Sequence, residues 1–414
     1  MSKNTSNALT YTAKETVRYT LWAIPVGGIV GLSSAFFLWL LDAATATREA
    51  NPLILTALPL AGFIIASVYT RYGKLEQAGN DRVIAEFTTP NQPLRLRMAP
   101  MVLFATVLTH LVGGSAGREG TAVQMGASLA DQFARRARLK LPNRKLLLQM
   151  GVAAGFGAVF GTPIAGAIFA LEVLSDKRVH WRGLLPAFAA GAIGHFACIG
   201  VGILHTEFTV VNYPKLSLET VGWLLVAALA FGFAARMYNV LLPNLSSRFT
   251  NWVPNPRWRA AAGGVLLAVV FLSLDASHYM GLGVPVIEDA FVNVRPWHDF
   301  IAKLVLTAFT LAVGFKGGEV TPLFFIGATL GSALSTVIPL PLDFLAAIGF
   351  VAVFAGATNA PLACTAMALE LFGFRGAGFY FVATVVAFAA VGKTGIYKTP
   401  EGRFINPLLG WMKR

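Results

Sequence analysis

The sequence predicts an all-α membrane protein, and the composition and the arrangement of its apolar residues carry this prediction. Of the 414 residues, 56% are hydrophobic and 13% are charged, about half the charged fraction usual in globular proteins. Long apolar blocks such as residues 20–41 and 53–69 contain hardly a charge, and about 20 such residues span a bilayer as a helix. This composition excludes a disordered chain, a collagen and a disulfide scaffold, and it argues against an ordinary soluble enzyme.

The charges favour a lipid bilayer, not a nucleic acid, as the partner of the chain. Lys and Arg total 33 against 20 Asp and Glu, a net charge of +13, which by itself also fits nucleic-acid binding. The basic residues, however, cluster in short loops between apolar blocks, and short cationic loops stay in the cytoplasm. The densest group comprises Arg135, Arg136, Arg138, Lys140, Arg144 and Lys145. We therefore expect this loop to be cytoplasmic.

Several apolar blocks are too short, or too interrupted by Gly and Pro, to form a simple membrane span. The blocks lie near residues 17–41, 53–70, 98–113, 120–134, 147–174, 183–204, 218–238, 259–274, 300–314, 320–338, 344–356, 360–373 and 375–391. Helices that stop midway across the membrane are tolerated only against protein or a polar cavity. The polar, proline-containing segment 251–259 is expected to be an interhelical loop.

The chain repeats itself, which indicates a transporter. Residues 161–172 parallel residues 359–370, with Pro, Leu and Glu in matched positions, and upstream 119–121 parallels 319–321. Matched broken helices in two halves place a substrate site near the midplane, at the repeat interface. We expect one transmembrane transport domain over 1–414, with a first repeat at about 15–210 and a second at about 218–400.

The first glycine-rich motif, residues 113–126, predicts a loop that feeds the N-terminus of a helix. The free N–H groups there, from Gly120 through Thr121 to about Ala122, would bind an anion. The Glu119 carboxylate could occupy this seat and leave it when protonated, which would couple anion passage to proton passage. The alternative is a plain carboxylate that favours the helix dipole, although an acid at membrane depth is first a functional hypothesis.

The second glycine-rich motif, residues 314–323, repeats this design. Proline at position 322 suits the first turn of a helix, so Val320 and Thr321 can offer backbone N–H groups and Thr321 a hydroxyl as well. Glu319 is a second candidate proton carrier. Its alternative is an ion pair with Lys316.

Two further polar turns supply candidate anion contacts. Residues 73–83 contain Gly79 and Asn80, whose amide can donate, and Arg82, which is either a pathway cation or an interfacial residue. Tyr397 follows a glycine-rich turn near the C-terminus. Its phenol can donate to an anion, or its ring can serve as an interfacial anchor.

Taken together, these motifs resemble the CLC anion transporters. The resemblance rests on Gly-Arg-Glu-Gly-Thr at 117–121, Gly-Gly-Glu-Val-Thr-Pro at 317–322, and the segments 161–172 and 359–370. It covers about residues 20–400 with the motifs in the correct order. It implies the CLC-type inverted repeat, with broken helices that meet at the bilayer midplane.

More narrowly, the chain is similar to the fluoride branch of this family. Thr121 stands where most chloride relatives carry Pro, and Gly-Asn at 79–80 is closer to the fluoride pattern than to Gly-Ser-Gly-Ile-Pro. Gly-Gly-Glu-Val-Thr-Pro at 317–322 and Gly-Ile-Tyr at 395–397 also look like that branch. Asp81 and Arg82 depart from it.

The resemblance implies roles residue by residue. Glu119 matches the external gating glutamate that accepts protons, and Tyr397 matches the central tyrosine at the anion. Val320 and Thr321 match the helix start whose amides face the anion, and Glu319 matches a glutamate of the fluoride branch. Glu207 lies roughly where chloride antiporters carry an internal proton-transfer glutamate, but loop polarity explains it and no role is assigned.

The function implied is fluoride/proton antiport that exports fluoride from the cytoplasm across the inner (plasma) membrane, by a homodimer with one pathway per subunit. No cofactor is expected, and the cytoplasmic CBS domains of some relatives are absent from this sequence. Fluoride is small and strongly hydrated, so a bare ion needs close, strong donors. The positive edges of aromatic rings could assist, and Phe324 and Phe325 follow the second motif directly.

Three alternatives remain from the sequence. A chloride-preferring CLC antiporter and a passive anion channel fit the same motifs. A membrane-embedded serine hydrolase formally fits Gly-x-Ser-x-Gly at 113–117, with Ser115 as nucleophile and His110 nearby. That motif requires a strand–turn–helix context, which an apolar membrane block does not offer, so we expect no enzyme activity. The histidines form no i, i+4 pair, so no metal site is expected.

Overall fold

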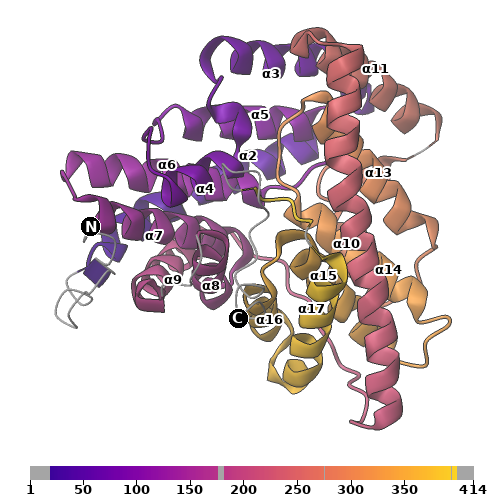
Figure 1. Cartoon of the computed structure of the whole chain (residues 1–414). Coiled ribbons are helices and arrows are strands. Elements are labelled where there is room, and N and C mark those ends of the chain that lie inside the picture. The colour runs from indigo at the N-terminus through magenta and orange to yellow at the C-terminus, as the bar shows by residue number, and fades with distance from the viewer. Residues whose placement is uncertain (1–18, 176–180, 275, 393, 399–414) are drawn as a thin grey trace, which may run out of the picture.

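A computed structural model describes residues 19–175, 181–274, 276–392 and 394–398, and Figure 1 shows these residues as a bundle of helices. Five helical segments are long and apolar enough to cross a membrane: Ala23–Ala50, Pro52–Tyr72, Trp181–Gly200, Leu218–Trp252 and Phe374–Val391. Other apolar helices of 10–17 residues are shorter than a bilayer needs. The predicted mixture of full spans and half-spans is therefore present in the described ranges.

The first half of the chain folds into helices that follow the predicted blocks. They are α2 (Ala23–Ala50), η1 (Pro52–Ala57), α3 (Leu58–Tyr72), η2 (Glu76–Ala78), α4 (Asn80–Thr88), α5 (Met98–Leu111), α6 (Glu119–Arg136), α7 (Leu141–Phe160), α8 (Pro163–Val173), η3 (Trp181–Gly183) and α9 (Leu184–Gly200). The block at 147–174 is two helices, because Gly161 adopts φ +73° and Pro163 starts α8.

The second half begins with a 35-residue helix that the sequence blocks underestimate. Its helices are α10 (Leu218–Trp252), α11 (Pro256–Ser273), η4 (Ser277–Tyr279), α12 (Val284–Asp289), α13 (His298–Val313), α14 (Val320–Leu334), α15 (Leu342–Thr358), α16 (Pro361–Phe372), η5 (Phe374–Gly376) and α17 (Ala377–Val391). The loop expected at 251–259 shrinks to 253–255. The Asn255 side chain accepts from Arg257 N at 3.0 Å, which caps α11 at once.

The two halves are built alike. Glycines let α6 cross α7 and α14 cross α15 with backbones nearly touching: a Cβ placed on Gly126 would lie 2.1 Å from the Gly151 oxygen. A Cβ on Gly327 would lie 2.0 Å from the Gly349 oxygen. In Figure 1 the first half lies at the left, α15–α17 lie low near the centre, and α10 runs from top to bottom with α13 and α14 on its right.

Candidate anion pathway

The two glycine-rich motifs meet backbone to backbone at the centre of the molecule. Gly117 N donates to Gly318 O at 2.6 Å, and Gly318 N donates to Gly117 O at 2.7 Å. Neither glycine can be replaced without a clash, because a Cβ on Gly318 would lie 2.9 Å from Gly120 N. This pairing brings the N-termini of α6 and α14 together, as the repeat predicts.

Glu119 is docked on the N-terminus of the helix in the other repeat. Its Oε2 accepts from Thr321 N at 3.1 Å and from Arg118 N at 3.1 Å, and its Oε1 accepts from the Thr321 hydroxyl. The side chain is 1% exposed. The carboxylate therefore occupies a seat made by two backbone N–H groups and a hydroxyl, the kind of donor set that binds an anion at the start of a helix.

The composition of that seat differs from the predicted one. Thr121 N and Ala122 N both donate to Arg118 O, and the Thr121 hydroxyl pairs with Thr106 of α5 at 2.7 Å. Thr121 was expected to bind the anion, but its hydroxyl is turned into the bundle. The reason is that Thr106 offers a buried partner one helix away, whereas the start of α14 supplies the donors to Glu119.

A cavity of about 600 Å³ reaches this centre from one side of the protein, and the predicted residues Gly79, Asn80, Glu319 and Tyr397 line it. Gly79 takes φ +56° at the start of α4 and so turns Asn80 inward. The Asn80 amide nitrogen lies 3.0 Å from the place a Cβ on Gly120 would take, which puts Asn80 beside the start of α6. The Asn80 Oδ1 atom is buried without a partner within the described ranges.

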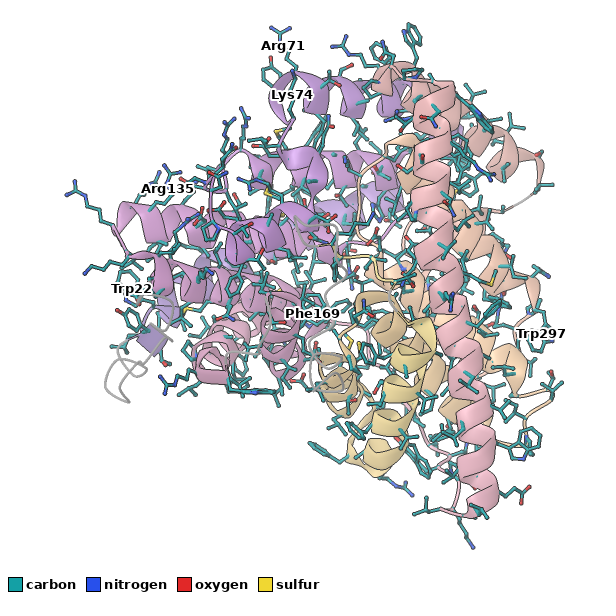
Figure 2. The ribbon with its side chains drawn as sticks, in the orientation of Figure 1. Trp22, Arg71, Lys74, Arg135, Phe169 and Trp297 are labelled. Carbon is teal, nitrogen blue, oxygen red and sulfur yellow. The ribbon has the colours of Figure 1, made fainter. Side chains whose placement is uncertain are left out.

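The positive-inside rule favours the cytoplasm as the compartment that this cavity faces. The cavity is lined at the end of α10 by Ser246, Ser247, Thr250 and Asn251, and the basic residues Arg248 and Arg257 lie nearby in the sequence. Arg71, Lys74 and Arg135 lie at the upper left of the molecule, away from Trp297 (Figure 2).

Glu319 faces the cavity without a hydrogen-bond or ion-pair partner among the residues that the structure describes. Its alternative, an ion pair with Lys316, is wrong, because the Lys316 ammonium donates to Gln77 O at 3.3 Å and lies 4.8 Å from the Tyr69 ring. The chain turns these two side chains apart at Gly317 and Gly318. A carboxylate that is unpaired beside water can exchange protons with it.

Tyr397 also faces the cavity and is 5% exposed, so the interfacial-anchor alternative is wrong. The chain on either side of it is fixed, since Ile396 N donates to Ala357 O at 2.9 Å and Lys398 N donates to Asp81 Oδ1 at 2.9 Å. Its ring packs edge-on against Phe169, at 6.1 Å between centroids. Asp81, which departs from the fluoride pattern, thus holds the segment that carries Tyr397.

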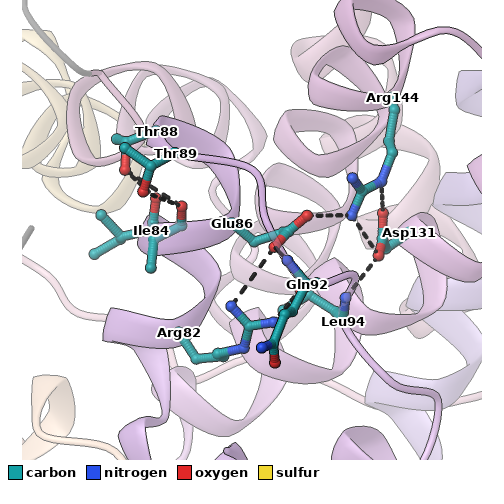
Figure 3. A network of polar contacts seen from close by, with 10 residues as sticks. Arg82, Ile84, Glu86, Thr88, Thr89, Gln92, Leu94, Asp131 and Arg144 are labelled. Atoms are coloured by element: carbon teal, nitrogen blue, oxygen red, sulfur yellow. Dashed lines mark hydrogen bonds and ion pairs between the residues drawn. The ribbon is translucent and has the colours of Figure 1, made fainter. Parts of the chain in front are cut away.

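Arg82 does not line the large cavity. Figure 3 shows it in a polar network with Glu86 and Gln92, where its guanidinium donates to Gln92 O and lies 3.6 Å from Glu86 Oε2. Arg144 closes the same network, donating to Glu86 Oε1 at 2.7 Å and to Asp131 Oδ2 at 2.9 Å. The network ties α4 to the cytoplasmic ends of α6 and α7, which fixes the turn that carries Asn80.

The two candidate phenylalanines point in different directions. Phe324 stacks on Phe350 at 3.8 Å and lines a second, small cavity of about 30 Å³ together with Arg118 and Thr321. Phe325 is turned away, with the Lys303 ammonium 5.2 Å from its ring. Consecutive residues of a helix face different sides. Of these two phenylalanines, Phe324 is therefore the one that faces the cavity beside Thr321.

The residues of the hydrolase alternative do not come together as a catalytic pair. The His110 ring contacts the carbonyl oxygens of Thr106 at 2.8 Å and Ala116 at 3.0 Å, and the Ser115 hydroxyl pairs with Thr307 at 2.9 Å. These contacts hold the loop before α6. The context is helix–loop–helix, not strand–turn–helix.

The matched glutamates 172 and 370 bind the helix of the opposite repeat. Glu370 accepts from Ile164 N at 2.9 Å and Ala165 N at 2.7 Å, at the start of α8. Glu172 accepts from Leu362 N at 3.2 Å and Ala363 N at 2.7 Å, at the start of α16. In these repeated segments, each glutamate therefore caps the N-terminus of a helix in the other repeat.

Sequence reasoning missed two residues near the pathway. The Tyr238 hydroxyl on α10 is buried and has no partner in the described part of the chain, within electrostatic range of Glu319 and Tyr397. His205 lines the small cavity beside Arg118. Neither belongs to a glycine-rich motif, and only the approach of α10 and of the linker 201–217 to the centre shows them.

Comparisons with known proteins agree with this architecture. A family model described as "Voltage gated chloride channel" matches residues 61–392. A "Chloride/fluoride channel protein" from Pseudomonas syringae pv. tomato is 43% identical over 376 residues, which cover 89% of this chain and 83% of that protein.

Solved structures extend the likeness to the whole fold. The crystal structure of a CLC-type fluoride/proton antiporter matches with a TM-score of 0.90 at 34% identity, over 95% of this chain and 99% of that chain. A slow cyanobacterial Cl−/H+ antiporter matches with a TM-score of 0.79 at 19% identity, over 96% of this chain and 98% of that chain, which concerns the fold alone. The predicted all-α inverted-repeat membrane fold and the resemblance to CLC anion transporters are confirmed.

Proposed function

Because the chain belongs to the voltage gated chloride channel (CLC) family, we propose that it exchanges fluoride for protons and expels fluoride from the cytoplasm. The observation that carries this proposal is the docking of Glu119 on Thr321 N and the Thr321 hydroxyl. A carboxylate in that seat excludes another anion, and protonation weakens its hold on the donors. Because the same seat takes either the ionised Glu119 side chain or the substrate anion, the movement of the anion is coupled to the movement of protons.

The donors around the seat suit a small, strongly hydrated ion. Thr321 supplies an N–H and a hydroxyl, while Asn80 and Tyr397 supply an amide and a phenol from the cytoplasmic cavity. Close N–H and O–H donors offset the loss of hydration of a buried anion. The solved fluoride/proton antiporter and the chloride/fluoride channel protein both support the choice of fluoride.

The test is anion flux from proteoliposomes that contain the purified full chain. An inward proton gradient should drive fluoride efflux, and an outward fluoride gradient should drive proton uptake, with chloride moved much more slowly. Chloride efflux at the rate of fluoride would favour a chloride-preferring antiporter. Fluoride efflux with no proton movement would favour a passive channel.

The remaining assignments are proposals of the same kind. We place the protein in the bacterial plasma membrane as a homodimer with one pathway per subunit, without enzyme activity. Cross-linking of the reconstituted protein, followed by mass measurement, tests the dimer.

A further inference from the structure

The small cavity beyond Glu119 is polar on one side only. It measures about 30 Å³ and is lined by Arg118, His205, Thr206 and Thr321 together with apolar side chains. That is room for about one water molecule, and its polar groups can hold one. Since Thr321 also donates its hydroxyl to Glu119, the cavity connects directly with the gate.

The cavity lies on the side opposite to the cytoplasmic one. His205 and Thr206 belong to the linker 201–217, which leads into the first residue of α10, whereas the large cavity lies against residues 246–251 at the other end of that helix. Thr321 lines the small cavity, and the two cavities share no lining residue.

His205 is oriented for proton transfer. Its Nε2 lies 2.8 Å from Ala158 O, and a carbonyl only accepts, so Nε2 carries hydrogen and Nδ1 holds the lone pair in the neutral ring. A Cβ on Gly161, which has none, would lie 3.2 Å from Nδ1. A side chain at position 161 would therefore crowd Nδ1, and glycine leaves room beside it. The ring is partly exposed, so external water can reach it.

The surroundings of His205 favour release of a proton over its retention. Two titratable or charged groups face the His205 ring. They are His195 on α9, whose ring centroid lies 5.2 Å away, and Arg118. The acids Glu119 and Asp42 lie on the far side of Arg118. The side chains that α7, α12, α15 and α16 contribute to the cavity are apolar. Burial, with His195 and Arg118 beside it, holds the pKa of His205 below its usual range.

We propose that His205 is the proton-transfer residue that loads Glu119 from the external side, through one water in the small cavity and the Thr321 hydroxyl. The inference rests on the proposed fluoride/proton exchange. The imidazolium Nδ1–H bond breaks as the cavity water gains that proton. The water passes one of its own protons to Thr321 Oγ1, whose original proton moves to Glu119 Oε1. The imidazolium becomes neutral, the carboxylate becomes a carboxylic acid, and rotation of the Thr321 hydroxyl resets the path.

The test uses His205→Gln in the full chain, because glutamine can still donate to Ala158 O but cannot carry a proton. Fluoride-driven proton uptake should fall by about 10- to 100-fold at neutral external pH, since a positioned proton-transfer group contributes roughly 10²-fold or more. The loss should shrink in acid, where hydronium reaches Glu119 directly. His298→Gln is the matched control, because His298 is an exposed histidine that lines neither cavity, and it should behave as the wild type.

A second variant separates proton transfer from folding. His205→Gly should lose the same activity, and imidazole added to the external solution should restore it, while fluoride affinity measured by calorimetry stays at the wild-type value in both variants. Unchanged proton uptake in His205→Gln, or no rescue by imidazole, overturns the relay. Weaker fluoride binding with an unchanged pH profile also overturns it and makes His205 an anion contact. A wild type that moves fluoride without protons refutes the proposed exchange itself, and the relay with it.

Discussion

Two pairs of glutamates occupy matched positions in the two repeats, and they behave in opposite ways. Glu172 and Glu370 are symmetric, each accepting two backbone N–H groups at the start of the other repeat's helix. Glu119 and Glu319 are not symmetric. Glu119 crosses to Thr321 of the other repeat, while Glu319 faces the cytoplasmic cavity without a partner in the described residues.

The difference separates scaffold from mechanism. In the reciprocal pair, the backbone N–H groups at the starts of both helices have a carboxylate acceptor. These hydrogen bonds stabilise the packing of α8 against α16. A pair in which one acid is docked and the other is unpaired leaves a free binding position and a free proton acceptor. The same sequence symmetry therefore yields one fixed contact and one exchangeable contact.

Glu119→Gln should have the largest effect, because it replaces the docked anion with a neutral group of the same shape. Proton-coupled fluoride flux should fall by roughly 10²-fold or more, the contribution typical of a proton-transfer group. The measurement is fluoride efflux driven by a pH gradient in proteoliposomes. Glu207→Gln, an exposed glutamate in the linker 201–217, is the control. Equal pH-driven flux in the Glu119 variant would refute its role as the gate.

Glu172→Ala should instead reduce stability. It removes a 1% exposed carboxylate and leaves Leu362 N and Ala363 N without their acceptor. Hydrogen bonds to charged groups contribute about 1.5–3 kcal/mol each, so we expect a loss of about 3 kcal/mol in the free energy of unfolding. That corresponds to roughly 10² in the folding equilibrium.

Denaturation of the purified protein in detergent measures this loss. Glu172→Gln keeps one side-chain oxygen as acceptor and should lose less. Folded Glu172→Ala protein should keep its ratio of fluoride to protons. A changed ratio would mean that this pair also takes part in transport.

Glu319→Gln should produce a smaller and purely functional change. The side chain has no partner to lose within the described part of the chain, so the midpoint of unfolding should stay at the wild-type value. Proton uptake driven by fluoride should fall by about tenfold, less than for Glu119, because cavity water can partly replace it. A drop in stability with unchanged proton uptake would make Glu319 a structural residue.

The sequence predicted the repeat and the meeting of the two motifs well, because glycine, proline and acidic residues at matched spacings have strong local consequences. Gly117, Glu119, Glu319 and Tyr397 all reach the centre of the molecule. Local signals could not tell which helix a side chain would face: the Thr121 hydroxyl pairs with Thr106, and the Phe325 ring lies beside the Lys303 ammonium. Each of these side chains points to a neighbouring helix that only the tertiary packing brings near.

Residues outside the motifs were beyond the reach of the sequence for a similar reason. Tyr238 looks like any aromatic residue of an apolar helix, and His205 looks like a polar loop residue. Their significance comes from a buried hydroxyl without a partner and from a small polar cavity. The short helices α4 and α12 were missed because a half-buried turn of 9 or 6 residues has no apolar block of its own.

Tyr397→Phe should have the smallest effect, because it removes one hydroxyl and keeps the ring against Phe169. If the phenol donates to the ion, fluoride affinity measured by calorimetry should weaken about fivefold, the equivalent of a hydrogen bond of about 1 kcal/mol. Tyr213→Phe is the control, since that hydroxyl donates to Phe372 O at 2.9 Å, outside both cavities. It should lower stability and leave affinity unchanged. Identical affinity in both variants would show that the helix-end amides and Asn80 bind the ion without the phenol.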